Sequence, residues 1–186
     1  MPHDLYTGKK IFACPPTKDH SPRAKAKQVL GLQPETQHLL VCAPNCDAGF
    51  LSDVLSMIYV GDDYDSEISV VCGENAELLR RLEHDLGHIE TIHLFGRSSD
   101  LPLLLDSADL LLAEPNEALA NEAAGRRLPL VLLRNENRLL PEFCRELLAK
   151  GCAVAVREDV QLAELCIQLL ADEKRRTQMA NDYAAK

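Results

Sequence analysis

The stretch from Ser107 to Leu133 constrains the fold of this chain more than any other. It opens with Asp109 to Ala113, a short and almost wholly apolar run that is typical of a parallel strand covered on both faces. Asn116 is then a good N-cap for a helix that we expect to end near Arg126. Pro129 to Leu133 predicts the next buried strand. The stretch therefore predicts one strand–helix–strand unit with parallel strands.

Apolar runs of the same kind recur along the chain and alternate with segments of helical period. The other expected strands are His38 to Ala43, Glu67 to Cys72, Ile89 to Phe95 and Cys152 to Val156. The other expected helices are Ala24 to Leu32, Phe50 to Tyr59, Asn75 to Leu86, a short helix capped by Ser98 or Ser99 that ends near Ser107, Leu140 to Lys150, Val160 to Leu170 and Glu173 to Ala184. This alternation predicts an α/β fold with a Rossmann-like, doubly wound parallel sheet of six strands. We expect a linker or arm with a short helix in residues 1–36, the Rossmann-like domain in residues 37–172 and a C-terminal helix in residues 173–186.

Composition narrows the class of partner. The chain has 186 residues, of which 46% are hydrophobic and 26% charged, as in an ordinary globular domain. Its formal net charge is -9 and its basic residues occur only in short pairs, so nucleic acid is not an expected partner. The sequence contains neither an apolar run of about 18 residues nor a signal-peptide core, so we expect a cytoplasmic chain.

The cysteines predict structural thiols. There are seven, an odd number, and no Cys-x-x-Cys occurs. Cys42 and Cys46 have no nearby histidine pair that would complete a zinc site. His84 and His88 are separated by Gly87, which we expect to end a helix between them. We therefore expect buried, unpaired thiols, no metal site and no cofactor.

The loop at Asn116 is the candidate ligand site. In α/β sheets the helix N-terminus that follows a strand is where phosphorylated ligands bind. Glu122 lies in the same helix, where a carboxylate can accept two hydrogen bonds from a ribose diol. In the alternative interpretation Glu122 is a solvated helix residue and Asn116 is only a cap. The pattern alone favours that alternative.

A resemblance to a known family favours the ligand site over that alternative. The segment 109–129 resembles the signature of GT-B glycosyltransferases related to monogalactosyldiacylglycerol synthases, processive diacylglycerol glucosyltransferases and the transferase that forms lipid II. The matching positions are Ala108-Asp109, Pro115, Glu122-Ala123 and Leu128-Pro129. Further along the family pattern, Gly96, Asp100 and Pro102 match the loop after the third strand, in which Arg97 replaces an aromatic residue. The resemblance covers roughly residues 5 to 175 and implies the C-terminal half of a GT-B fold.

The resemblance implies a UDP-hexose donor site and a lipid acceptor such as diacylglycerol. By position, it places uracil on the backbone of Gly96 and Arg97 and the ribose on Glu122. It places the diphosphate near Asn116, Glu117, Ala118 and Leu119, with contacts from the first loop at Asn45, Cys46, Asp47, Ala48 and Gly49. The acceptor site, any membrane contact and the catalytic base belong to the amino-terminal half of such enzymes, so we assign no catalytic residue and expect this chain alone to be inactive.

The candidate site departs from the family pattern at several positions. Asn116 and Glu117 replace two glycines, Leu119 replaces a hydroxyl residue and Arg127 replaces a last glycine. The family's two sugar ligands, a Gln and an Asn, fall near Arg138 or Leu139 and at Phe143, and neither is kept.

The charge of Glu117 repels a diphosphate at the helix N-terminus, so we expect weak nucleotide binding. A second hypothesis follows, a non-catalytic binding or scaffold domain that kept the fold and lost the donor site. A nucleotide-sugar epimerase is a third, less favoured alternative.

Overall fold

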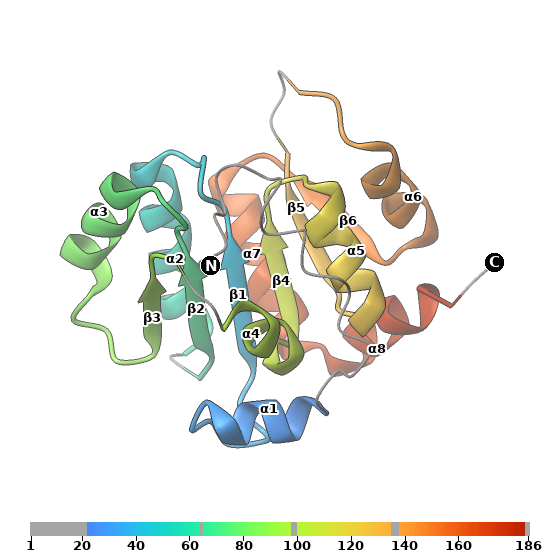
Figure 1. The fold of residues 1–186 in the computed structure, drawn as a ribbon, viewed down its shortest axis with the longest axis horizontal. Coiled ribbons are helices and arrows are strands. Elements are labelled where there is room, and N and C mark those ends of the chain that lie inside the picture. The colour runs from blue at the N-terminus through green and yellow to red at the C-terminus, as the bar shows by residue number, and fades with distance from the viewer. Residues whose placement is uncertain (1–21, 64, 98–99, 135–137, 185–186) are drawn as a thin grey trace.

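The computed structural model describes residues 22–63, 65–97, 100–134 and 138–184. In these ranges the chain forms a six-stranded sheet in the order β3-β2-β1-β4-β5-β6, and every neighbouring pair is parallel (Figure 1). The strands are β1 His38–Cys42, β2 Glu67–Val71, β3 Ile92–Phe95, β4 Leu110–Ala113, β5 Leu130–Leu133 and β6 Ala153–Val156. The helices are α1 Arg23–Val29, α2 Ala48–Gly61, α3 Ala76–Leu86, α4 Leu101–Ser107, α5 Glu117–Arg126, α6 Glu142–Lys150, α7 Asp159–Ala171 and α8 Glu173–Asp182.

The predicted fold class is confirmed, and the differences lie at the ends of elements. β3 begins at Ile92 and not at Ile89, because the chain leaving α3 makes a turn in which the Ile92 N–H bonds the Ile89 carbonyl over 3.2 Å. α6 begins only after Pro141, which occupies its N-cap position. Ser98 and Ser99, predicted to cap the short helix, lie outside the described residues, and Asp100 is the residue that precedes α4.

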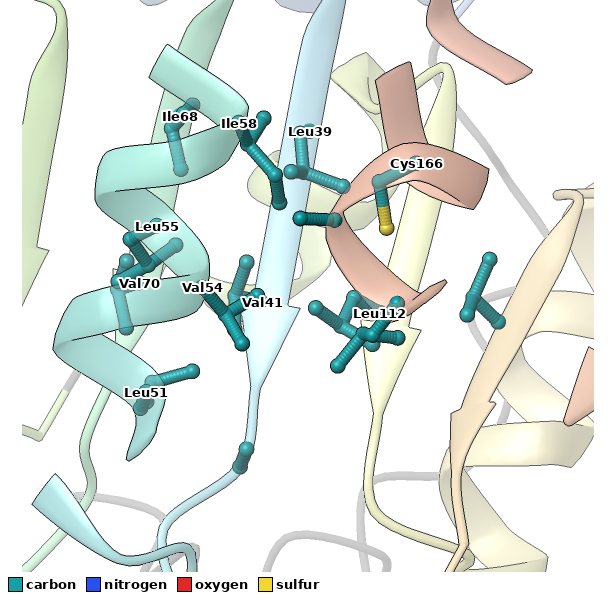
Figure 2. Packing of buried hydrophobic residues seen from close by; sticks show 14 of the residues in the cluster. Leu39, Val41, Leu51, Val54, Leu55, Ile58, Ile68, Val70, Leu112 and Cys166 are labelled. Atoms are coloured by element: carbon teal, nitrogen blue, oxygen red, sulfur yellow. The ribbon is translucent and has the colours of Figure 1, made fainter. Parts of the chain in front are cut away.

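Two hydrophobic layers enclose the sheet because strand side chains alternate between its faces. In β1, Leu39 and Val41 face α2 and α7, whereas Leu40 and Cys42 face α4 and α5. Figure 1 shows α4 and α5 in front of the sheet and α2 and α7 behind it. α2 packs through Leu51, Val54, Leu55 and Ile58, whose helical spacing brings them onto one side, against β1 and β2 (Figure 2).

The thiols that the structure describes are unpaired, as predicted. Five of the six are buried and Cys46 is half-buried. Burial raises the pKa of Cys42, Cys72 and Cys166 to about 12, which keeps these thiols protonated and unreactive. Cys14 lies outside the described residues.

At the amino ends of the strands, a buried ion pair fixes α1 to the sheet. Lys27 Nζ lies 2.6 Å from the Asp109 carboxylate, and their side chains are 3% and 8% exposed. Lys27 also donates to the carbonyls of Thr36 and Pro34, and Asp109 accepts a 2.9 Å bond from the His38 backbone N–H. Because both charges have hydrogen-bond partners, their burial is tolerated. Nothing in the local sequence pattern indicated this pair.

None of the helices in the described ranges is long and apolar enough to cross a membrane. Nor do the described residues include a group of three or more His, Cys, Asp or Glu side chains that could hold a metal ion.

Candidate functional site

The strand order reverses between β1 and β4, which are neighbours in the sheet although β2 and β3 separate them in the chain. At such a reversal the loops leave the two strands toward opposite faces, which opens a crevice at the carboxyl ends of the strands. The loops after β1, β3 and β4 all leave from that edge (Figure 1). The predicted site residues in these loops therefore lie along one edge of the sheet, whereas Glu122 lies in the middle of α5.

The N-terminus of α5 is closed by its own cap. Asn116 has an extended backbone, and its side-chain oxygen accepts hydrogen bonds from the Ala118 N–H over 3.0 Å and the Leu119 N–H over 3.2 Å. Glu117 lies exposed in the first turn. A phosphate that used these two amides would have to displace the Asn116 side chain and approach the Glu117 carboxylate. The predicted cap is confirmed, and it occupies two of the donors that such a ligand needs.

Glu122 has a charged partner within the protein. It forms an ion pair with Arg126 one turn later, and the Arg126 Nε donates a 2.7 Å bond to Asp106 of α4. Arg126 is 5% exposed in this arrangement, and Glu122 is 22% exposed. The chain of charges joins α5 to α4, so Glu122 has a structural partner, and its side chain is still partly exposed.

Gly96 packs against the loop that follows β2. Its carbonyl accepts a 3.2 Å hydrogen bond from the Gly73 N–H, and a Cβ at this position would lie 3.4 Å from Leu79 Cδ2. Arg97 forms an ion pair with Glu74 of the same neighbouring loop. The backbone path after β3 is therefore held by contacts with the loop after β2.

The first loop is shorter than predicted. α2 begins at Ala48, so Ala48 and Gly49 belong to its first turn and not to the loop. Asp47 is the N-cap, and its carboxylate accepts a 2.9 Å hydrogen bond from the Phe50 N–H. Asp47, predicted as a first-loop contact, therefore has a structural role at the start of α2.

Glu114, which the sequence pattern did not single out, joins the first loop to the central unit. Its carboxylate accepts a 2.7 Å bond from the Asn45 backbone N–H and a 3.0 Å bond from the Asn45 side-chain amide. Burial raises the pKa of Glu114, and the bonds from Asn45 oppose that shift. The available signal was its place directly after β4, at the reversal of strand order.

A cavity of about 560 Å³ opens beside this contact, at the carboxyl ends of β1, β4, β5 and β6. Three of the predicted first-loop residues, Asn45, Cys46 and Asp47, line it. The other predicted site residues do not line it: Gly96, Arg97, Asn116, Glu117, Ala118, Leu119, Glu122, Ala48 and Gly49. Three arginines that were not predicted as ligands do so, namely Arg134, Arg138 and Arg157.

A second cavity, of about 530 Å³, lies at the amino ends of the strands. Its charged lining residues include Lys27, Asp109 and Arg176. Arg176 donates to the carbonyls of Leu169 and Leu170 and, over 2.8 Å, to the Gln37 side chain. With Lys27 and Asp109 paired, the buried charges of this cavity are bonded within the protein, which indicates a structural role.

Known proteins with a similar sequence are glycosyltransferases. Over 123 residues the chain is 29% identical to a processive diacylglycerol beta-glucosyltransferase of Bacillus cytotoxicus, a match that covers 61% of this chain and 29% of that protein. A protein of the same name from Bacillus cereus is 28% identical over 125 residues, which are 62% of this chain and 30% of the relative. The matched segment is thus less than a third of these relatives. No model of a known protein family matches the chain.

Solved structures give the fold. WaaG, a glycosyltransferase involved in lipopolysaccharide biosynthesis, superposes with a TM-score of 0.70 at 18% identity, over 98% of this chain and 50% of its own. The chain has the fold of one half of a GT-B glycosyltransferase. MurG of Acinetobacter baumannii superposes on this GT-B domain with a TM-score of 0.64 at 12% identity, over 89% of this chain and 49% of its own. For a putative UDP-N-acetylglucosamine 2-epimerase from Listeria monocytogenes the TM-score is 0.69 at 19% identity, with 88% and 42% covered.

Proposed function

We propose that this chain is the UDP-sugar-binding domain of a glycosyltransferase that transfers a hexosyl group to a lipid acceptor such as diacylglycerol. The observation that carries the proposal is the sequence similarity to processive diacylglycerol beta-glucosyltransferases. That similarity also favours glycosyl transfer over epimerisation, because the epimerases match in fold at 19% identity or less. Among the proteins of the same fold, the epimerase of Neisseria meningitidis was crystallised with UDP-GlcNAc and MnaA of S. aureus with UDP.

The proposed nucleotide site follows the carboxyl edge of the sheet. The uracil would lie against the backbone of Gly96 and Arg97, and the ribose hydroxyls would meet the carboxylate of Glu122, whose side chain is 22% exposed. The phosphates would lie beyond the N-terminus of α5. Binding is weak in this proposal, because Asn116 occupies two amides of that terminus and Glu117 adds a negative charge there.

The rest of the reaction belongs to other parts of a longer protein in this proposal. The relatives are about three times as long as the segment that matches them. We assign the acceptor site, the catalytic base and any membrane contact to such parts, and the connection to them to residues 1–36. Residues 37–172 then form the donor domain, with residues 173–186 as its C-terminal helix, in a cytoplasmic setting.

One observation favours a second candidate, a GT-B-like domain that has lost the donor site and serves as a binding or scaffold module. The groups expected to hold the nucleotide already have partners within the protein. Asn116 satisfies the α5 amides, and Arg126 pairs with Glu122. In a vacated site, such internal pairing replaces the ligand's hydrogen bonds.

Titration calorimetry with UDP separates the two candidates. For the donor domain we expect weak binding that Glu117→Gln tightens about two- to fivefold, because a repelling charge at a helix N-terminus is removed. Glu122→Gln keeps the shape of the side chain but removes its charge, and we expect about tenfold weaker binding because hydrogen bonds to a charged group are lost. Glu142→Gln, in the first turn of α6, is the matched control and should leave UDP binding unchanged.

Absence of UDP binding at millimolar concentration, in both the wild type and Glu117→Gln, would contradict the donor-domain proposal and leave the scaffold module.

A further inference from the structure

The cavity beside Glu114 has an arginine-lined mouth. By the resemblance, a lost sugar ligand falls near Arg138, and no ligand group falls on Arg134 or Arg157. Arg134 follows β5 directly and Arg157 follows β6 directly. The two strands pair Leu133 with Val156, and the Arg134 N–H donates a 3.0 Å bond to the Val156 carbonyl. Arg134 and Arg157 therefore follow directly after neighbouring strands, and their backbones are about 5 Å apart. Strand pairing fixes both residues at the edge where the cavity opens.

Arg138 adds a third positive charge to the same mouth. Burial raises the pKa of Glu114, which lines the same cavity, and the charge of Arg138 opposes that shift together with the bonds from Asn45. Arg134 and Arg138 are the two arginines on which the inference rests, because both are exposed and can turn toward a ligand in the cavity.

Three acidic residues also line the cavity, and two of them are already engaged. Asp47 caps α2 through the Phe50 N–H, and Glu114 accepts two hydrogen bonds from Asn45. Glu158 is exposed at the start of α7 and makes no capping bond. The carboxylates of Asp47 and Glu114 are thus directed to backbone and amide donors, whereas Glu158, Arg134 and Arg138 are exposed.

The walls between these charges are apolar. Phe50, Pro115, Leu133 and Pro141 contribute to a volume of about 560 Å³, which is within the range for small-molecule sites of about 300 to 1,000 Å³. Such a cavity suits a ligand that has an uncharged part to bury and an anionic part to leave at the rim.

We infer that Arg134 and Arg138 bind the phosphate groups of the ligand at the mouth of this cavity, in place of the capped amides of α5. The inference rests on the proposed function for its nucleotide, and it names the group that each part of the site takes. A guanidinium donates two parallel hydrogen bonds to a phosphate and is the side chain best matched to it in geometry. The N-terminus of α5 is less suited to a phosphate, because two of its amides are occupied by Asn116 and Glu117 adds a negative charge there.

Three probes test the inference on the 186-residue chain: UDP, uridine and inorganic pyrophosphate. Calorimetry should show that Arg134→Gln and Arg138→Gln each weaken UDP and pyrophosphate binding about tenfold and leave uridine binding unchanged, since charge-assisted hydrogen bonds to phosphate are lost. Arg134→Lys and Arg138→Lys should recover part of the loss because the charge returns without the paired donors. Arg145→Gln, an exposed arginine of α6 outside the cavity, is the matched control.

The failures are distinguishable. UDP binding that is equal in all variants would overturn the arginine site and leave the proposed function standing. Pyrophosphate binding that depends on Arg134 and Arg138, in a chain that binds neither UDP nor uridine, would support the arginine site and contradict the proposed function. If neither UDP nor pyrophosphate binds the wild type, both are overturned.

Discussion

Asn116 shows how one side chain can replace a ligand. Where the GT-B signature that this segment resembles has a glycine, the asparagine places its oxygen on the amides of Ala118 and Leu119 and completes the first turn of α5. The helix gains a cap, which is worth about 1 kcal/mol, and the terminus loses two free donors. In the proposed donor site, this one difference would stabilise the fold and weaken nucleotide binding, which would then draw on other groups such as the arginines after β5.

His38 shows a buried titratable group whose partners come from distant parts of the chain. Its ring nitrogens lie 2.7 Å from Ser107 Oγ and 2.8 Å from Ser69 Oγ. Because Ser107 donates its own proton to the Leu104 carbonyl, it must accept one from His38 Nδ1. His38 Nε2 is then the acceptor for Ser69, and the neutral ring satisfies both contacts.

We predict that His38 makes the protein acid-sensitive. Burial lowers its pKa from 6.5 to about 4, so below pH 6.5 the unfolded chain binds a proton that the folded chain does not. The free energy of unfolding should fall by about 3 kcal/mol as pH drops from 6.5 to 4. Urea denaturation across this range should show that His38→Asn removes this part of the slope, whereas His84→Asn, at an exposed position, does not. Equal slopes for the wild type and His38→Asn would refute the prediction.

At the scale of elements, local sequence patterns predicted the strands, the helix ends and one pair within a helix. The six strands were visible as apolar runs, and Asn116 and Gly151 marked the ends of their helices because caps depend on neighbouring residues. The pair of Glu122 and Arg126 also had a visible signal, their i, i+4 spacing on one helix. Its link to Asp106 on α4 did not, because it depends on how two helices pack.

The candidate site was less predictable for the same reason. The bond between Asn45 and Glu114 joins positions 69 residues apart, and it exists only because β1 pairs with β4. Arg134 and Arg157 likewise lie next to each other because of the register of β5 and β6. Strand order and register are properties of the whole sheet, so the loops that meet at its edge cannot be read from any one segment.

The C-terminus of α5 carries a backbone strain that a substitution should relieve. Arg127 adopts φ 51° and ψ 41°, a left-handed conformation that costs a residue with a Cβ about 1 to 2 kcal/mol. The GT-B signature that the segment resembles has glycine here, and Arg127 is exposed. Arg127→Gly should therefore raise the free energy of unfolding by about 1 kcal/mol, measured by thermal or urea denaturation.

The matched test of the same principle is Gly151→Ala at the end of α6. Gly151 has φ 87°, and a Cβ there would lie 2.9 Å from an Asp182 oxygen. This substitution should destabilise the protein by about 1 kcal/mol or more. A stabilising Gly151→Ala or a destabilising Arg127→Gly would contradict the assignment of these two helix ends.

The whole molecule separates its charged groups between two edges of the sheet. At the amino edge, Lys27, Asp109 and Arg176 are buried and bonded within the protein. At the carboxyl edge, exposed arginines surround a cavity at the reversal of strand order. The two cavities are similar in volume, and the cavity at the carboxyl edge has the position that α/β sheets use for ligands.

Mapping of amide chemical shifts during a UDP titration tests the central claim, that the carboxyl edge binds a nucleotide. In the ¹⁵N-labelled chain, we predict concentration-dependent shifts at Gly96, Leu119 and Arg134, which belong to three different loops or turns at that edge. The amide chemical shifts of Lys27 and Arg176, at the opposite edge, should not change and serve as the internal reference. Shifts confined to the amino edge, or none at millimolar UDP, would contradict the account.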